Sequence, residues 1–576
     1  MRIRWYGTGR VNVTEARLAS VSGPPTVDAM TSLPFRRPPI LLELDLTEVP
    51  VDPTPDDPVA RLRARGRAQL RPTLRTLHEA GEDRHVVGLV AKVGGALPWA
   101  TMQELRQGVR AFASHGKPTV AWAESFSEVS DMAAYVLATG FDEMWLQPSG
   151  NIGMLGVGVE TTFLRGALDR LGIEPQLEQR HEYKNAADRF MRTDFTPAHR
   201  ESLTRLAESV FTGAVEDIAA GRRMEADEVR RLIDTGPRTA AEARDARLID
   251  ELGYRDQIYA AMRSRVADDA ELLFADRWRR RRRPSLPARR KGHVALVEVH
   301  GGIVTGRTRR GAPGRQVGSD SITAQLRAAI SNDSARAVVL RINSPGGSAV
   351  ASDTIWREVC RVREAGKPVI ASMGEVAASG GYYVACPADV VVALPATLTG
   401  SIGVVSGKLV ANNLLERVGL TTGVVEQGAR SRMYSARRGF TDDERERLGA
   451  TMDAIYDDFV SKVAQGRRRT VPEIEDVARG RVWTGRDALC NGLVDELGGL
   501  RRAIDIARTR AELPDDAPVL HPIHVPPVAR LRRPRNSEDP RAASLTSTLG
   551  PRLSDLTAVL DMPTETVLRM PEIRIR

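Results

Sequence analysis

Short hydrophobic runs alternate along the chain with longer stretches in which apolar residues recur at helical spacing. In the first half the hydrophobic runs are Pro38–Leu46, His85–Gly95 and Thr119–Ser125, and the helical pattern fills Val59–Ala80 and Met102–Ala113 between them. Apolar runs of this length are typical of buried strands, and their alternation with helices indicates parallel pairing through helical crossovers. The pattern therefore predicts an α/β fold with mainly parallel sheets.

The same order of elements returns about 250 residues later. Ala295–Val304 corresponds to Pro38–Leu46, and Ala337–Gly347 corresponds to His85–Gly95. The further pairs, in the same order, are Ala133–Gly153 with Gly381–Gly403, Asp194–Leu203 with Gly439–Leu448, and Leu248–Gly253 with Leu493–Gly498. The chain is therefore a tandem duplication, and its period is far too long for a solenoid, so each copy is an α/β unit of domain size.

Five segments follow from this repeat. Residues 1–35 are polar and rich in Gly, Pro and Arg, and we expect a flexible arm there. The first copy spans residues 36–275 and the second copy spans residues 293–512. Residues 276–292 form an Arg-rich linker between them, and residues 513–576 form a tail rich in Pro and Arg.

The formal charge of +9 does not by itself indicate a nucleic-acid-binding protein. Arg277–Lys291 holds nine basic residues and no acidic residue, which equals the whole excess. We expect this segment to be solvated; the alternative is an electrostatic contact with anionic lipid or nucleic acid. No nucleic-acid partner is expected for the two copies.

Three well-separated cysteines, Cys360, Cys386 and Cys490, give neither a disulfide framework nor a zinc spacing. No HExxH or Walker-type motif occurs in the sequence, so no metal and no cofactor is expected. The N-terminal residues lack the continuous apolar segment of a secretory signal, and no run of about 18 apolar residues occurs. We expect a cytoplasmic protein.

The stretch GEVAASGGYY, Gly374 to Tyr383, is the strongest candidate for chemistry. It follows the strand-like run Pro368–Met373 and places Ser379 at the start of a predicted helix. Backbone amides at a helix start favour negative charge, and Gly380 and Gly381 lack a Cβ that would block a substrate carbonyl. The alternative is an ordinary helix cap, in which the serine hydroxyl accepts a backbone hydrogen bond.

The two copies differ at this turn. Opposite Ser379 the first copy has Asp131, within one residue, and the glycine pair is absent. Opposite Asn343–Gly347 the first copy keeps only Gly94-Gly95. Turns after parallel strands converge on the ligand site of such sheets. Amides of Gly346 or Gly347 together with Gly380 are therefore candidates for a two-donor oxyanion hole.

A serine nucleophile needs a base, and the candidate base lies in the other copy. Lys184, in RHEYKNAADRF, precedes the predicted helix of the first copy, whereas the matching place in the second copy has arginines. Arginine stays protonated, but lysine can act as a base if almost complete burial lowers its pKa from about 10.4 towards neutrality. His181 also stays open as a base, although no histidine shows an obvious pairing with an acid.

The motifs NSPGG, GEVAASGGYYVA, TGSIGV and, in the first copy, EYKNAADRF followed by FTPAHRESL resemble the long, duplicated form of signal peptide peptidase A, also called protease IV. The likeness covers about residues 38–510. It implies a ClpP/crotonase-like fold in both copies and a serine endopeptidase with a Ser-Lys dyad. Ser379 would be the nucleophile, Lys184 the base and Ser401 the residue that holds the lysine amine. Gly346, Gly347 and Gly380 would form the oxyanion hole.

The resemblance also implies partners. Substrates would be apolar peptides, such as signal peptides left after secretion, and the chain would form a homo-oligomer, commonly a tetramer. Long forms of this family usually begin with a membrane-spanning anchor, which is not visible here. We therefore expect, at most, peripheral contact of the Arg-rich linker and tail with the inner face of an anionic membrane.

Two other functions fit the same fold. An acyl-CoA hydratase or isomerase also uses paired amides, although such enzymes usually rely on carboxylates near the oxyanion hole. A non-catalytic peptide-binding scaffold would result if the two copies did not bring Lys184 close to Ser379.

Overall fold

The computed structural model describes residues 38–52, 67–126, 132–282, 292–311, 314–522, 567–570 and 573. The predicted N-terminal arm, Asp131 and most of the predicted tail lie outside the described residues. The described residues from 39 onwards form one compact unit, which contains both copies of the repeat.

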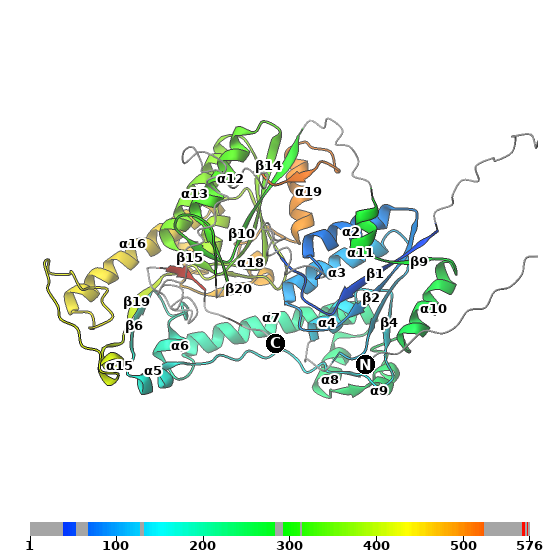
Figure 1. Ribbon diagram of the computed structural model, residues 1–576, viewed down its shortest axis with the longest axis horizontal. Helices are drawn as coiled ribbons and strands as arrows, with labels where there is room; N and C mark the ends of the chain where they lie inside the picture. Colours follow the sequence, from blue (N-terminus) through cyan, green and yellow to red (C-terminus); the bar gives the residue numbers. More distant parts are fainter. Residues whose placement is uncertain are drawn as a thin grey trace, which may run out of the picture. The chain divides into compact units, whose positions relative to one another are not determined.

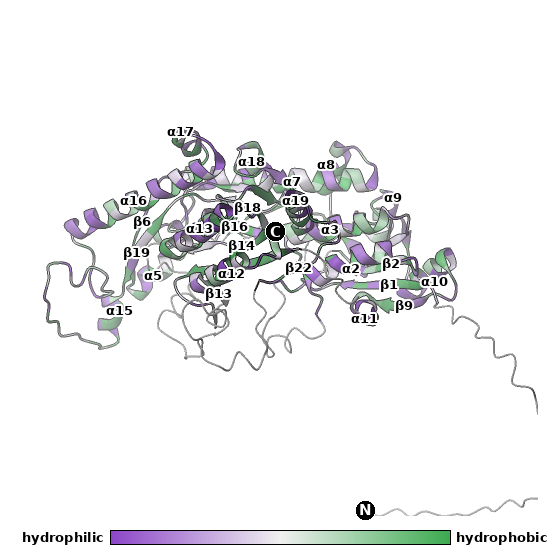
Figure 2. Cartoon of the chain, turned by 90° about the horizontal axis from the view of Figure 1, so that it is seen from above, coloured by the Kyte–Doolittle hydropathy of each residue, from purple (hydrophilic) through white to green (hydrophobic). Residues whose placement is uncertain are grey.

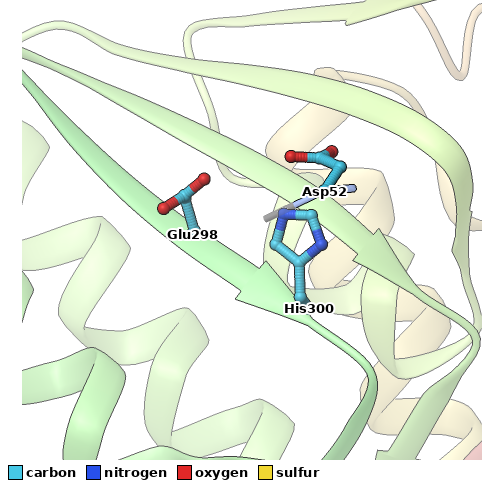
Figure 3. A group of neighbouring side chains, drawn as sticks. All are labelled: Asp52, Glu298 and His300. Carbon is cyan, nitrogen blue, oxygen red and sulfur yellow. The ribbon is translucent and has the colours of Figure 1, made fainter. Parts of the chain in front are cut away.

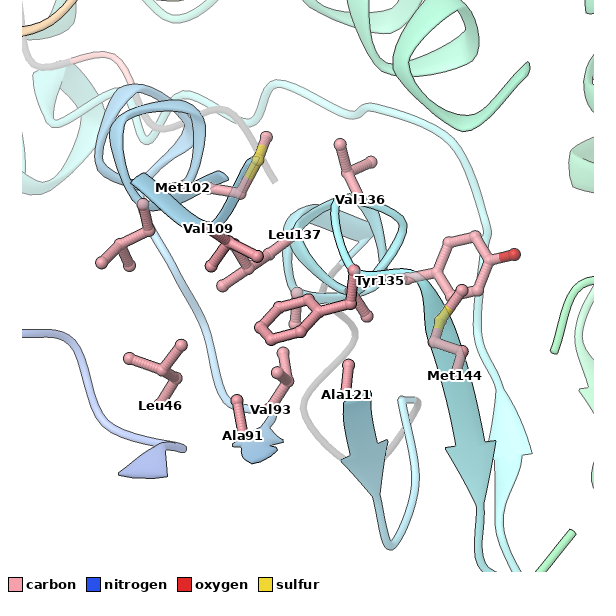
Figure 4. Packing of buried hydrophobic residues seen from close by; sticks show 14 of the residues in the cluster. Leu46, Ala91, Val93, Met102, Val109, Ala121, Tyr135, Val136, Leu137 and Met144 are labelled. Carbon is pink, nitrogen blue, oxygen red and sulfur yellow. The ribbon is translucent and has the colours of Figure 1, made fainter. Parts of the chain in front are cut away.

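A six-stranded parallel sheet forms the centre of the first copy (Figure 1). Its order is β8-β4-β3-β2-β1-β9, with β1 (Ile40–Leu46), β2 (Val86–Val93), β3 (Thr119–Ala123), β4 (Glu143–Leu146), β8 (Glu251–Leu252) and β9 (Glu271–Phe274). Side chains alternate between its two faces. Leu42 and Ala91 pack on one face with helices α2 (Leu70–Glu82), α3 (Trp99–Ala113) and α4 (Met132–Ala138). Figure 4 shows part of this cluster. Leu41 and Val90 pack on the other face with α10 (Arg255–Val266).

The second copy repeats this plan. Its sheet has the order β20-β18-β16-β14-β10-β22, with β17 and β21 attached beside β16. The strands are β10 (His293–His300), β14 (Ala335–Ser344), β16 (Val369–Ala378), β17 (Val390–Ala393), β18 (Leu398–Gly400), β20 (Val482–Thr484), β21 (Glu496–Leu497) and β22 (Val519–Leu520). Helices α12 (Ser319–Ser331), α13 (Ala349–Glu364) and α14 (Gly380–Ala385) cover one face, and α19 (Leu500–Arg510) covers the other.

The remaining elements surround these sheets. In the first copy they are β5 (Asn151–Ile152), α5 (Arg165–Leu171), α6 (Asp188–Met191), α7 (Pro197–Arg222), α8 (Ala226–Asp234), β7 (Arg238–Thr239) and α9 (Ala240–Asp245). In the second copy they are α15 (Asn412–Arg417), α16 (Asp442–Arg467), α17 (Val471–Glu475) and α18 (Gly485–Cys490). Hydrophobic colour follows the buried strands such as β1, and polar colour is more frequent on outer helices such as α16 (Figure 2).

Equivalent hydrogen bonds occur in the two copies. The Tyr135 hydroxyl donates to the Leu248 carbonyl at 2.7 Å, and the Tyr382 hydroxyl donates to the Leu493 carbonyl at 2.8 Å. These four residues occupy matching places in the repeat. The predicted α/β class with mainly parallel sheets, and its tandem duplication, are confirmed.

A third sheet, which the sequence did not predict, joins the two copies. Its order is β12-β13-β11-β15-β23-β19-β6, with β6 (Glu174–Gln179), β11 (Gly302–Val304), β12 (Arg309–Gly311), β13 (Gly314–Gly318), β15 (Gly346–Ser348), β19 (Val405–Val410) and β23 (Val567–Arg569). Strand β6 of the first copy pairs antiparallel with β19 of the second copy, with Leu177 opposite Gly407. At Gly407, φ is +147° and a Cβ would lie 2.2 Å from the Gln176 carbonyl oxygen, so this close pairing requires glycine.

Buried polar contacts hold the copies together at a second place. Arg341 of β14 lies 2.7 Å from Glu104 of α3, and each side chain is only 3% exposed. The Glu375 carboxylate accepts hydrogen bonds from the backbone amides of Ala100 and Thr101 at the start of α3. Buried charges are tolerated only when they are paired, so these contacts fix how α3 lies on the second copy.

The predicted Arg-rich linker is not irregular throughout. Helix α11 (Ala275–Arg281) includes its first residues, and Trp278 is buried. Arg281 forms an ion pair with Glu271, and Arg282 lies 3.0 Å from Glu79. Residues 283–291 lie outside the described residues. Among the helices that the structure describes, none has the length and apolar character needed to cross a membrane.

Candidate active site

Ser379 lies at a sharp turn between β16 and α14. Its φ and ψ are 55° and −117°, a region that residues other than glycine seldom adopt. The turn is fixed by backbone hydrogen bonds, because the Ser379 amide donates to the Gly400 carbonyl and the Tyr383 amide donates to the Ser379 carbonyl, both at 2.8 Å. The Ser379 side chain makes no capping hydrogen bond. The alternative of an ordinary helix cap is therefore wrong, and the hydroxyl has another partner.

That partner is Lys184 of the first copy. Its Nζ lies 2.8 Å from Ser379 Oγ, 2.8 Å from the Ser401 carbonyl oxygen and 3.0 Å from Ser401 Oγ. All three residues are 0% exposed. The structure thus brings together, within one chain, three residues that the sequence singled out, two of them from the second copy and one from the first.

A neutral Lys184 amine can satisfy all three contacts. A neutral lysine has two N–H donors and one lone pair, whereas a hydroxyl can donate one hydrogen. The Ser401 carbonyl and hydroxyl oxygens can accept the two N–H bonds. The lone pair then faces the Ser379 hydroxyl, which is the arrangement that proton removal by a base requires.

The environment also favours the neutral amine. Complete burial lowers the pKa of Lys184 well below its usual 10.5, because the buried amine is desolvated. Burial disfavours the charged form of a lysine because the ammonium loses its hydration. Below pH 10, a larger fraction of Lys184 is therefore neutral than of a lysine in water.

Two segments of the second copy hold Lys184 in place. The Arg180 amide donates to the Val404 carbonyl at 3.0 Å, and the Tyr183 amide donates to the Arg479 carbonyl at 3.2 Å. At Gly480, φ is +85° and a Cβ would lie 2.4 Å from the Lys184 backbone nitrogen. The Lys184 turn can approach this closely only because residue 480 is glycine.

The predicted oxyanion glycines lie next to the nucleophile. A Cβ at Gly380 would lie 3.1 Å from both Gly346 Cα and Gly347 N, so Gly380 and the Gly-Gly turn are in close contact. The Gly346 amide donates to Ser344 Oγ at 3.1 Å. Because this engages Gly346 in its own turn, the arrangement favours Gly347 and Gly380 as the pair of donors.

Sequence reasoning missed several residues around Lys184. Buried His199 Nδ1 lies 3.6 Å from Asp188 Oδ2, which is too long for a hydrogen bond. Asp188 accepts a hydrogen bond of 2.8 Å from Asn185, the residue after Lys184. Asn185 and Asp188 lie in the EYKNAADRF motif and His199 lies in the adjoining FTPAHR motif, so these motifs were the sequence evidence that could have identified them. His181 packs its ring against Tyr456 with 4.4 Å between centroids, and the partner of Ser379 is Lys184.

A second polar cluster lies between the copies. Asp52 of the first copy and Glu298 and His300 of β10 have ligand-type atoms within 4.8 Å of one another (Figure 3). However, Arg71 lies 3.1 Å from Glu298, and Arg341 lies 4.0 Å from Asp52. These guanidinium groups already supply the positive charge that a metal ion would bring, so the cluster fits an ion-pair network better than a metal site.

Comparisons with known proteins agree with this site. The sequence profile of "Peptidase family S49" matches residues 111–268 and 361–514, and that of "Clp protease" matches residues 311–399. The chain is 31% identical to "Protease 4" of Salmonella typhi, over 76% of this chain and 71% of that protein. It is also 31% identical to "Serine protease SPPA, chloroplastic" of Arabidopsis thaliana, over 76% of this chain and 65% of that protein. A "Putative signal peptide peptidase SppA" of Enterococcus faecium is 32% identical over 35% of this chain and 58% of its own length.

The predicted resemblance to the protease IV family is thus confirmed by two profile matches in the two copies and by relatives aligned over three quarters of the chain. One match to the S49 profile lies in each half of the chain. The chain belongs to peptidase family S49.

Proposed function

We propose that this chain is a serine endopeptidase in which Lys184 takes the proton of the Ser379 hydroxyl. The observation that carries the proposal is the 2.8 Å contact between Lys184 Nζ and Ser379 Oγ in a fully buried setting. Burial supports it further, because it lowers the pKa of Lys184 and so supplies a neutral base.

The proposed reaction has two stages. Ser379 Oγ attacks the carbonyl carbon of the scissile bond while its proton moves to Lys184 Nζ, and the Gly347 and Gly380 amides stabilise the oxyanion. The lysine ammonium then gives its proton to the leaving amine, which leaves an acyl group on Ser379. Water then attacks this ester while Lys184 takes its proton, the bond between the acyl carbon and Ser379 Oγ breaks, and the lysine ammonium returns the proton to Oγ as the peptide acid leaves; Ser401 keeps the amine in place throughout.

The proposed substrates are extended apolar peptides, including cleaved signal peptides. One relative of this chain is named a putative signal peptide peptidase, and the two aligned over most of the chain are named proteases. Apolar side chains surround the nucleophile, since Ala378 packs in a cluster with Leu203, Leu398 and Val482. An extended peptide that adds to a sheet edge beside this cluster would place alternate side chains in apolar surroundings.

Substitution of the two proposed catalytic residues tests the function. Ser379→Ala and Lys184→Met should each reduce hydrolysis of an apolar fluorogenic peptide by at least about a thousandfold, because nucleophile and base act as a unit. Lys92→Met is the matched control, since Lys92 forms a partly exposed pair with Glu124 in the first copy. Full activity of Lys184→Met, with an unchanged melting temperature, would refute the Ser-Lys mechanism.

The same preparation separates the alternatives. Hydration of a crotonyl thioester without peptide hydrolysis would indicate an acyl-CoA hydratase, and binding of peptide without either reaction would indicate a scaffold. The S49 membership supports neither of them.

We further propose a homo-oligomer, a tetramer by resemblance, in the cytoplasm or at the inner face of an anionic membrane. Light scattering after size-exclusion chromatography measures the subunit number, and a monomer would contradict the proposed homo-oligomer. Sedimentation with anionic liposomes at physiological salt tests the proposed membrane contact, and a protein that stays in the supernatant would rule it out.

A further inference from the structure

A strand from the C-terminal end of the chain lies in the third sheet between two strands of the active-site region. Strand β23 pairs antiparallel with β15 on one side, with Gly347 opposite Leu568, and with β19 on the other, with Val405 opposite Val567. In Figure 1 it is the red strand beside β15. Among the described strands, β23 is the one that connects β15 to β19.

Both neighbours of β23 belong to the proposed catalytic centre. Strand β15 begins with Gly346 and Gly347, and Gly347 N would lie 3.1 Å from a Cβ at Gly380. Strand β19 begins four residues after Ser401, which contacts the Lys184 amine. A peptide between β15 and β19 is thus bound by main-chain pairing on both edges, as in recognition by strand addition. In this structure the position between β15 and β19 is occupied by β23 of the same chain.

Met570 anchors this segment beside the nucleophile. Its amide donates to the Pro345 carbonyl at 2.8 Å, and its side chain is only 4% exposed. It packs in one cluster with residues of both copies, namely Leu203 and Leu206 of α7, Ala378, Leu398 and Val482, and Ile573 packs against the same cluster. Ala378 directly precedes Ser379 in the chain, so the Met570 pocket adjoins the reaction centre.

An open pocket continues from this cluster. It has a volume of about 350 Å³, and Val159, Phe195 and Leu203 belong both to its lining and to the apolar cluster that holds Met570. Its other lining residues include Phe211 and, at its polar part, Arg200 and Glu208. Apolar side chains of a bound peptide thus find room beyond the space that Met570 fills.

We infer that residues 567–570 are a built-in occupant of the peptide cleft and compete there with apolar peptides, with Met570 as their anchor. The inference rests on the proposed function, since it assigns the substrate cleft of the same site. A segment of the same chain meets the cleft at an effective concentration of about millimolar, so weakly binding peptides are excluded and tightly binding apolar peptides displace it. The Met570 pocket selects substrates with an unbranched or aliphatic side chain at the matching position.

Binding measurements on the full chain test this without any catalysis. In the Ser379→Ala background, a fluorescein-labelled peptide with the sequence of residues 564–576 is titrated and followed by anisotropy. The additional substitution Met570→Asp places a charge in an apolar pocket and should release the segment. We expect the labelled peptide to bind at least about tenfold more tightly to the Met570→Asp form, whereas Met570→Leu, which keeps an apolar anchor, should bind it as weakly as the parent.

The controls distinguish specific occupancy from a general change. A labelled peptide in which aspartate replaces the residue equivalent to Met570 should bind neither form, and melting temperatures should agree between the forms. Equal affinity of the parent and the Met570→Asp form for the labelled peptide would overturn the inference.

The peptidase proposal and the occupancy of the cleft by β23 can fail independently of each other. If no apolar peptide is hydrolysed by the chain with Ser379 intact, yet Met570→Asp still opens the cleft in the binding assay, the peptidase proposal fails and the occupancy stands. If hydrolysis occurs but Met570→Asp leaves both KM and peptide affinity unchanged, the peptidase proposal stands and the occupancy is wrong.

Discussion

The two copies keep the same polar contacts in their sheets but differ in the residues at the ends of their strands. Lys117 Nζ donates to the carbonyls of Ala80 and Asp83, and Lys367 Nζ donates to those of Ala329 and Ile330 at the equivalent place. The tyrosine hydroxyl that bonds a distant carbonyl is also present in each copy. These contacts thus recur at equivalent places in the two copies.

The second copy, which carries Ser379, differs in strand length. Strand β3 of the first copy has 5 residues, whereas the equivalent β16 has 10 and continues to Ser379. Strand β2 has 8 residues, and the equivalent β14 has 10 and leads to the Gly-Gly turn. The additional length carries the candidate nucleophile and oxyanion donors beyond the part of the sheet that the copies share. Residues of the candidate site can therefore differ between copies without loss of the common fold.

The largest expected effect concerns the contact between the copies. Arg341→Met leaves Glu104 buried without its partner and should lower the free energy of unfolding by about 3–5 kcal/mol. Arg357→Met is the control, because the Arg357–Glu364 pair is more than half exposed and should contribute at most about 1 kcal/mol. Urea unfolding followed by circular dichroism measures both. A loss below 1 kcal/mol for Arg341→Met would mean that this ion pair does not hold the copies together.

Gly347 of the active-site turn and Gly94 of the first copy should differ in their effect on activity. A Cβ at Gly347 would lie 2.0 Å from the Ile303 carbonyl oxygen, whereas a Cβ at Gly94 of the first copy would have its nearest neighbour at 3.8 Å. We expect Gly347→Ala to reduce kcat/KM by about a hundredfold to a thousandfold through displacement of an oxyanion donor, and Gly94→Ala to change it less than about twofold. Melting temperatures show whether each variant folds. Similar kcat/KM values for two folded variants would refute the oxyanion assignment.

The lysine-holding serine gives a smaller expected effect. Ser401→Ala should lower kcat by about tenfold to a hundredfold with little change in KM, because the Ser401 carbonyl still holds the amine and base catalysis as a whole contributes about 10²–10⁴. The matching residue of the first copy is the exposed Asn151, and Asn151→Ala should leave kcat unchanged. An unchanged kcat for Ser401→Ala would remove Ser401 from the mechanism.

The pH dependence should follow Lys184. Activity requires the neutral amine, so it should fall about tenfold for each pH unit below the pKa of Lys184, which burial lowers well below 10.5. Between this lowered pKa and that of the unfolded chain, the unfolded state binds more protons, so stability rises with pH in this window. Relative to Lys184→Met, the wild-type free energy of unfolding should therefore increase from neutral to alkaline pH. A constant difference across this range would contradict the buried neutral lysine.

Much of the fold and of the candidate site can be predicted from the sequence, because the repeat provides an internal comparison. Ser379 and Lys184 stand out in the sequence as residues that one copy has and the other lacks, the Gly-rich turns indicate the glycines, and the resemblance to protease IV indicates Ser401. Gly480 and the β23 pairing were not predicted, because their roles depend on segments that meet only in the folded chain. Helix α11 was not predicted since its arginines suggested a solvated segment, whereas buried Trp278 and two ion pairs fix it.

The division of Ser379 and Lys184 between the copies has a consequence for synthesis of the protein. The ribosome completes the first copy with a lysine that has no serine beside it, and that lysine reaches its buried position only after the loop at Gly480 has been made and has folded. A nascent or prematurely terminated chain therefore carries no assembled dyad. Under the proposed mechanism, other proteins of the cell are not exposed to cleavage by an unfinished copy of this one.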